Sequence, residues 1–205
     1  MNQDAMEEKN ANTENWDAFI DLRKDRPVRA MVSQAVALVT NRERALDLGA
    51  GALNATKYLL SQDFKRVDSA DPADGAAKLA KDIRDERLHF YQSTAEDFPF
   101  SEAVYDIVNA EFALPFIHRE KFPEAMRKML SSIKLGGIFT GQLFGINDEW
   151  NVAGVKETFV TREEALKLFE GFEKIKFEEE DKPGLTAKGF TKHWHIFHII
   201  AQKMA

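Results

Sequence analysis

Two acids of the sequence stand where a nucleotide cofactor could be held. Asp47 lies among the apolar residues Ala45, Leu46 and Leu48 of a predicted strand, and Asp71, 24 residues later, ends a second predicted strand. The first strand leads into Gly49-Ala50-Gly51, whose two glycines allow a tight turn and let a ligand lie against bare backbone. A helix that follows such a turn presents free amide groups to a polar or anionic ligand. An acid about 20 residues further on can bind ribose hydroxyls, so the spacing predicts a nucleotide-type cofactor site.

Plainer explanations of both features stay open. The dinucleotide fingerprint G-x-G-x-x-G is incomplete, because Asn54 stands where its third glycine should be. The turn could simply join a strand to a helix, and Asp71 could cap the helix that Pro72 begins. Asp68 competes with Asp71 for the ribose contact, although the position along the strand favours Asp71.

The stretch Asp47-Leu48-Gly49-Ala50-Gly51 resembles the first motif of the class I S-adenosylmethionine-dependent methyltransferases, which has the form Asp/Glu-x-Gly-x-Gly. The resemblance implies S-adenosylmethionine as the cofactor, with Asp47 beneath its methionine part. Further cofactor contacts that it implies are those of Gly49, Ala50, Gly51, Asp71 and Pro72. Nicotinamide enzymes usually carry an apolar residue in place of Asp47. The likeness runs from about Trp16 to the C-terminus, whose last part is loosely similar to tellurite-resistance-type small-molecule methyltransferases.

Residues 93–100 resemble the family's Asp-Ala-x-x-x-Pro-Phe stretch, whose Asp and Ala contact the adenine edge. Thr94 replaces that Asp, and Ala95 matches the Ala. A hydroxyl can still accept a hydrogen bond from the adenine amine, but without charge assistance, which would weaken cofactor binding or pass the contact to Glu96. An ordinary acidic surface loop is the structural alternative.

Residues 105–112 resemble the family's fourth strand, which adjoins the first where the winding of the sheet reverses. Open α/β sheets bind ligands outside the strand ends at that point. Asn109 and Ala110 are therefore expected at the methionine end of the cofactor. Glu111 is the one charged residue there, and it either orients or deprotonates the acceptor or is solvated beside the pocket.

Arg29 belongs to a basic segment before the first strand. It can reach the carboxylate of the cofactor or of a substrate as a bidentate fork, or it can be a solvated charge at a helix start. In the resembling family the segment before the first strand often covers the cofactor, so residues 15–40 are predicted to form N-terminal lid helices.

His193 and His195 share one face of the last predicted strand, and Trp194 lies on the other. If the preceding strand is parallel to the rest, loop 180–190 and these residues lie at the ligand end of the sheet. His193 and His195 are then candidate general bases, with packed histidines as the alternative. The pair is also a weak metal signal, but no third ligand is identified and no metal site is predicted. His198, deeper in the strand, is interpreted as structural.

Aromatic residues beside these loops are candidates for the walls of an acceptor pocket. They are Phe112, Trp150 and Trp194. Trp150 follows the fifth predicted strand, so it either lines the pocket or packs under its own loop.

The strands and helices expected from the sequence, which must position these residues, predict an α/β fold. The expected strands are residues 44–48, 67–71, 88–92, 105–112, 138–144, 172–177 and 191–202. Helical spacing between them indicates a Rossmann-like doubly wound sheet of seven strands, six parallel. The resemblance makes the last strand antiparallel and places it between the fifth and sixth.

Composition limits the classes of protein and partner. The 205 residues, 44% of them hydrophobic, suit one α/β domain over 15–205, preceded by a disordered tail over 1–14. A net charge of −6 without a basic patch predicts no nucleic-acid partner. No apolar run in the sequence is long enough to predict a membrane span. The absence of cysteine excludes disulfides, and a cytoplasmic location is expected. The sequence does not indicate an oligomeric state.

The function expected from these features is transfer of the methyl group of S-adenosylmethionine to a small-molecule acceptor. A non-catalytic S-adenosylmethionine-binding module remains an alternative because of Thr94. A nicotinamide-dependent oxidoreductase is a weaker alternative, since it leaves Asp47 and the incomplete fingerprint unexplained.

Overall fold

The computed structural model describes residues 16–204, which fold around one mixed β-sheet. Its main path runs β3-β2-β1-β4-β5-β8-β7, with β6 paired to β5 outside that path. The strands are β1 (Arg44–Leu48), β2 (Arg66–Ala70), β3 (Leu88–Tyr91), β4 (Tyr105–Ala110), β5 (Ile133–Gly145), β6 (Phe159–Val160), β7 (Phe172–Leu185) and β8 (Thr191–Lys203). The predicted tail over 1–14 lies outside the described residues.

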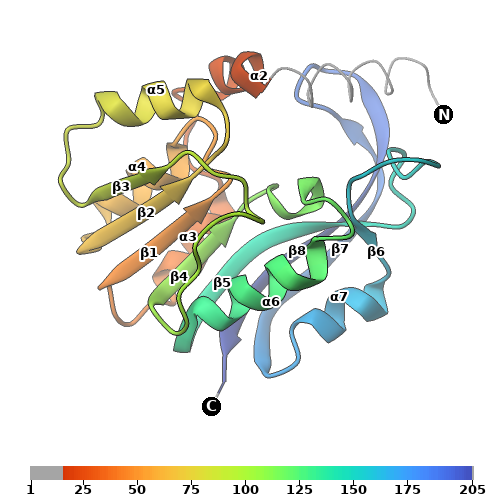
Figure 1. Cartoon of the computed structure of the whole chain (residues 1–205). Helices are drawn as coiled ribbons and strands as arrows, with labels where there is room; N and C mark the ends of the chain where they lie inside the picture. The colour runs from red at the N-terminus through yellow and green to blue at the C-terminus, as the bar shows by residue number, and fades with distance from the viewer. Residues whose placement is uncertain (1–15, 205) are drawn as a thin grey trace.

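Helices cover both faces of the sheet (Figure 1). They are α2 (Trp16–Arg23), α3 (Ala30–Ala37), α4 (Asn54–Ser61), α5 (Asp74–Asp82), η1 (Leu114–Phe116), α6 (Phe122–Ser132) and α7 (Arg162–Leu168). Apolar residues of α3 and α4 pack with one face of β1, β2 and β4, while those of α6 and α7 pack with the other face of β4, β5 and β8. Among residues 16–204, no helix is both long and apolar enough to cross a lipid bilayer.

The fold confirms the predicted doubly wound sheet with an antiparallel last strand. β8 runs antiparallel to both β5 and β7 and lies between them. Two details differ. The short β6 adds a strand parallel to β5, and β7 continues to Leu185 through part of the predicted loop 180–190. β7 is an edge strand with many exposed side chains, and an edge tolerates the charged run that had suggested a loop.

The glycine turn after β1 has a steric reason for its first glycine. Gly49 adopts φ +70°, and a Cβ built on it would clash with the Cβ of Ala113, just beyond β4. Gly51 also has positive φ, at +49°, but only the carbonyl oxygen of Gly49 lies near its missing Cβ, at 3.9 Å. The turn is therefore packed on one side and bare on the other.

Gly49→Ala should lower the free energy of unfolding by about 2–4 kcal/mol, since it adds a clash to backbone strain. Gly136→Ala is the matched control, because φ is +76° there and nothing lies within 4 Å of the added Cβ. The control should cost about 1 kcal/mol, from strain alone. Urea unfolding of both variants measures the difference, and equal losses would contradict the packing of Gly49 against Ala113.

Candidate cofactor and acceptor site

A cavity of about 700 Å³ lies at the carboxyl ends of β1 and β4. Its lining comes from α2, the basic segment before α3, the glycine turn, loop 93–96 and the region just after β4, and then from β7 and β8. Figure 1 shows these parts around one end of the sheet, with α2 on one side and the β7–β8 hairpin on the other. The volume falls within the range of about 300–1,000 Å³ that is usual for cofactor and small-molecule sites.

Most of the predicted binding residues line this cavity. They are Arg29, Asp47, Gly49, Ala50, Gly51, Asp71, Pro72, Thr94, Ala95, Glu96, Asn109, Glu111, Phe112, Trp150 and Trp194. Ala110 does not line it. Its side chain alternates to the opposite face of β4 and packs in the core cluster that includes Leu114, so the geometry does not support a side-chain contact of Ala110 with the cofactor.

Asp47 is a buried carboxylate at the end of β1, with 1% of the residue exposed. The hydroxyl of Thr56 on α4 donates to one of its oxygens at 2.6 Å, and the side-chain amide of Asn109 on β4 donates to the other at 2.7 Å. Burial raises the pKa of Asp47, and these two hydrogen bonds oppose the rise. The carboxylate therefore ties together three elements that meet beneath the cavity.

Asp71 holds the glycine turn in place. The amide of Gly51 donates to one carboxylate oxygen at 2.8 Å, and the amide of Ala73, at the start of α5, donates to the other at 2.9 Å. Each oxygen keeps a lone pair for a further donor, such as a ribose hydroxyl. Burial is the largest influence on Asp71 and raises its pKa. Asp68, the competing candidate, is bound to Arg44, Arg66 and Tyr105 away from the cavity.

Thr94 is engaged within its own turn. Its hydroxyl donates to the carboxylate of Asp97 at 3.0 Å and accepts from the amide of Asp97 at 3.3 Å. An adenine contact through Thr94 therefore competes with this turn, whereas Glu96 lines the same part of the cavity.

Glu111 projects into the cavity just after β4. Its Oε1 lies 3.2 Å from Nε of Arg29 but has no hydrogen-bond partner among the described residues. Burial raises the pKa of Glu111 to about 7, against the opposing charge of Arg29. The Arg29 guanidinium also lies 4.8 Å from the ring centroid of Phe112. Near neutral pH, Glu111 is thus poised between its two protonation states.

The predicted bases His193 and His195 do not line the cavity. Nε2 of His193 lies 2.6 Å from Asp181, and Nε2 of His195 lies 3.0 Å from Glu179, both on β7. The cavity instead receives Trp194, Ile196 and His198 from β8. Neighbouring residues of a strand point to opposite faces, so Trp194 lines the cavity while His193 and His195 lie outside its lining, and their role as general bases stays a prediction without support from this geometry.

Glu179, Asp181 and His195 lie close enough together to invite a metal interpretation, with one ligand atom of each within 4.8 Å of the others. Nδ1 of His195 accepts a hydrogen bond from the amide of Asn147 at 3.0 Å. The neutral ring then carries its proton on Nε2 and donates to Glu179, which leaves no lone pair there for a metal. The geometry fits a hydrogen-bonded cluster that holds loop 146–151.

Sequence reasoning missed the polar pair His198 and Glu180, whose Nε2 and Oε2 lie 3.3 Å apart in the cavity lining. It also missed Phe116 and Phe144. The sequence does contain a signal for His198. It lies an even number of residues from Trp194, which places both side chains on the same face of β8.

A buried ion pair fixes the aromatic part of the lining. Lys192 is fully buried, with its ammonium bound to Asp148 and 3.7 Å and 4.1 Å from the ring centroids of Trp194 and Trp150. Asp148 also accepts from the amides of Trp150 and His195 at 3.0 and 3.1 Å. The loop after β5 and the start of β8 are thereby joined through one carboxylate.

Lys192→Met should lower the free energy of unfolding by about 3–5 kcal/mol, because it leaves the Asp148 carboxylate buried without its cation. Lys128→Met removes an exposed pair with Glu124 on α6 and should cost less than about 0.5 kcal/mol. Thermal or urea unfolding compares the two. A loss as small as that of the control would contradict the role of the Lys192–Asp148 pair.

The ligand-free protein should lose stability as the pH rises from about 4.5 to 7 because of Glu111, whose pKa is raised from 4.5 to about 7 on folding. The group's contribution is fully present below its unfolded pKa and declines through its folded pKa. Glu111→Gln should remove this loss, which is on the order of 1–3 kcal/mol, in urea unfolding at pH 5 and pH 8. Glu124→Gln, at an exposed acid, is the control and should not remove it. An unchanged pH dependence in Glu111→Gln would refute the assignment.

A family model described as "Methyltransferase domain" matches residues 46–140, just under half of the chain. Among solved structures, TehB from Haemophilus influenzae superposes with a TM-score of 0.73 at 16% identity, covering 86% of this chain and 62% of that one. The 1,6-didemethyltoxoflavin-N1-methyltransferase of Burkholderia thailandensis, solved with 1,6-didemethyltoxoflavin and S-adenosylhomocysteine bound, gives 0.64 at 19% identity, covering 98% and 89%. The methyltransferase in complex with the Haloferax volcanii Trm112 activator gives 0.71 at 16% identity, covering 95% and 97%.

At these identities the structural likeness concerns the fold, and the chain spans 62% of the length of TehB. A search of curated proteins found no significant match. The family match covers β1 to β5, which carry Asp47, the glycine turn, Asp71 and Glu111. Residues 46–140 thus match the methyltransferase-domain family, in agreement with the resemblance and the S-adenosylmethionine cofactor expected from the sequence, and the solved structures confirm the predicted fold.

Proposed function

We propose that the protein transfers the methyl group of S-adenosylmethionine to a small-molecule acceptor. The observation that carries the proposal is a set of hydrogen-bond acceptors in the cavity lining. It comprises the Asp47 carboxylate, Oδ1 of Asn109, which is buried without a hydrogen bond among the described residues, and Oε1 of Glu111, which faces Nε of Arg29 at 3.2 Å. An unsatisfied buried acceptor is costly, so such a set fits a ligand that brings positive charge or donors. The methionine end of S-adenosylmethionine carries an ammonium and a sulfonium.

The remaining contacts fit the rest of the cofactor. The bare side of Gly51 allows close approach, Asp71 has lone pairs free for ribose hydroxyls, and loop 93–96 offers Glu96 to an adenine amine. Arg29 stands between Glu111 and Phe112, where it can pair with a carboxylate. When bound, S-adenosylmethionine supplies an electrophilic methyl group, so the task of the chain is to orient two molecules and exclude water.

Glu111 is the proposed general base for an acceptor that must lose a proton. Of the three predicted catalytic residues, it alone lines the cavity, and its pKa of about 7 suits proton uptake near neutral pH. An acceptor that is already a strong nucleophile, such as a thiolate, needs no base. We propose residues 15–40 as the lid of the domain that spans 15–205, because α2 and the residues before α3 line the cavity.

A small acceptor, rather than nucleic acid, is supported by the net charge of −6. The heteroaromatic acceptor of the Burkholderia thailandensis neighbour supports it further. A cytoplasmic location remains part of the proposal. A binding module without catalysis is the second candidate, and the occupied hydroxyl of Thr94 is the observation in its favour.

Isothermal titration with S-adenosylmethionine, S-adenosylhomocysteine and NADH tests the cofactor half of the proposal. The first two should bind and NADH should not. Asp71→Ala should lose at least about 1 kcal/mol of binding free energy, the scale of a hydrogen bond to a charged group. Asp82→Ala, at an exposed acid that ends α5, should bind as the wild type does. Binding of NADH alone, or no binding at all, would overturn the proposal.

Glu111→Gln tests the proposed base in a methyl-transfer assay that measures S-adenosylhomocysteine release. With an O–H or N–H acceptor, kcat should fall by about 100-fold or more, and the inflection of the wild-type rate near pH 7 should vanish. If Glu111→Gln keeps both the wild-type kcat and the inflection near pH 7, Glu111 is not the general base. Cofactor binding without turnover across thiol, phenol and amine acceptors would favour the binding module.

A further inference from the structure

Aromatic rings form one part of the cavity lining. Phe144 lies at its centre, with ring centroids 5.9 Å from Phe116, 5.9 Å from Trp150 and 6.0 Å from Trp194. Trp150 and Trp194 are 5.3 Å apart. All four line the cavity together with Phe112, so this acceptor chamber joins the cofactor region at the end of β4.

The chamber is rigid on the side of β8. The buried Lys192–Asp148 pair holds both indoles, and Asp148 binds the backbone of Trp150. Rings whose positions are fixed in advance offer flat surfaces without the entropy cost of ordering them on binding. Aromatic rings pair best with other flat rings, by offset stacking or edge-to-face contact.

A cage of aromatic rings often indicates a cationic ligand, but the cations here are supplied by the protein itself. The Lys192 ammonium lies over Trp194 and Trp150, and the Arg29 guanidinium lies over Phe112. One face of each of these rings is therefore already occupied by a cation of the protein. The Lys192 charge is neutralised by Asp148, and Glu180 and Glu111 line the same cavity, so the lining favours an uncharged acceptor over an anion.

The chamber has one polar place where a ring substituent can be recognised. His198 and Glu180 line it, with Nε2 and Oε2 3.3 Å apart. His198 pairs with Gln142 across β5 and β8, and the side chain of Gln142 accepts the amide of Phe112 at 2.8 Å. The His198–Glu180 pair thus lines the same cavity as Phe112 and is linked to it through Gln142.

We propose that the acceptor is a flat, uncharged aromatic ring compound that packs against the accessible faces of Phe112, Phe116 and Trp194 and presents a hydroxyl or ring N–H to the His198–Glu180 pair. This inference rests on the proposed function and adds the chemical class of the acceptor. It also assigns His198, on the face opposite to His193 and His195, as the histidine that contacts the acceptor.

Titrations of the protein saturated with S-adenosylhomocysteine test the chemical class with three probes of the same ring count. 2-Naphthol is flat and neutral, N-methylquinolinium is flat and cationic, and decahydro-2-naphthol is neutral but saturated. 2-Naphthol should bind at least about fivefold more tightly than either of the others. Equal binding of the saturated alcohol, or tightest binding of the cation, would overturn the inference.

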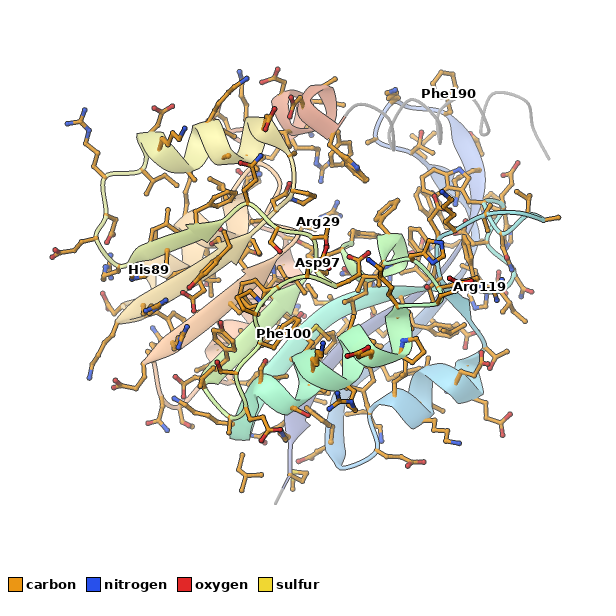
Figure 2. All side chains as sticks on the ribbon, viewed as in Figure 1. Arg29, His89, Asp97, Phe100, Arg119 and Phe190 are labelled. Carbon is orange, nitrogen blue, oxygen red and sulfur yellow. The ribbon has the colours of Figure 1, made fainter. Side chains whose placement is uncertain are left out.

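Variants identify where the probe binds. Trp194→Leu and Phe116→Leu should each weaken 2-naphthol by about fivefold or more, and His198→Asn should remove its advantage over naphthalene, which lacks the hydroxyl. Phe190→Leu at the hairpin tip and His89→Asn at the far edge of the sheet are matched controls, and Figure 2 shows both residues at the periphery. Equal effects of the controls would overturn the inference.

The binding of S-adenosylhomocysteine separates this inference from the proposed function. Its affinity is measured first, and its absence would overturn the proposed function. If S-adenosylhomocysteine binds tightly but the three probes bind with equal affinity, the proposed methyl transfer stands and the aromatic acceptor is rejected.

Discussion

The buried carboxylate of Asp47 is the constraint on which the site depends. A carboxylate with 1% exposure is costly unless donors surround it, and Thr56 and Asn109 supply those donors from α4 and β4. Thr56 also exchanges a hydrogen bond with Ser69 on β2, at 2.8 Å. The strands on both sides of β1 are thereby fixed relative to the glycine turn. The side-chain amide of Asn109 is turned toward Asp47, which leaves its Oδ1 without a hydrogen bond among residues 16–204.

The same arrangement gives the cavity two ends with different chemistry. Around Asp47, Asn109 and Glu111 the lining offers acceptors and raised carboxyl pKa values, which suit the positive end of S-adenosylmethionine. Beyond Phe112 the lining is aromatic, and its charges are paired within the protein. Arg29 stands at the boundary, near the centre of the molecule in Figure 2, where it contacts both Glu111 and Phe112. One molecule can thus be held by charge and hydrogen bonds while a second is held by stacking.

Local patterns predicted the cofactor half from sequence because each depends on residues that are close in the chain. The glycine turn has conformational requirements that only a few residues meet, and Asp71 follows at a characteristic distance. The acceptor half depends on which face of β8 meets the cavity, and that choice is made by pairing between distant strands. Trp194 was predicted there, whereas His193 and His195 lie on the other face and His198 replaces them. The strand at 172–177 was predicted, but its continuation to Leu185 was not, for a related reason: the position of β7 at the edge of the sheet, where charged residues are tolerated, depends on pairing between distant strands.

A crystal structure of the complex with S-adenosylhomocysteine tests the central claim most directly, because it locates both ends of the cofactor relative to Asp47. The account predicts the ribose hydroxyls on Asp71, the adenine beside loop 93–96 and the amino group against Oδ1 of Asn109 or Oε1 of Glu111. The chamber around Phe144 should remain free for an acceptor. A reversed orientation, with the adenine among the aromatic rings and the methionine end at loop 93–96, would contradict the account.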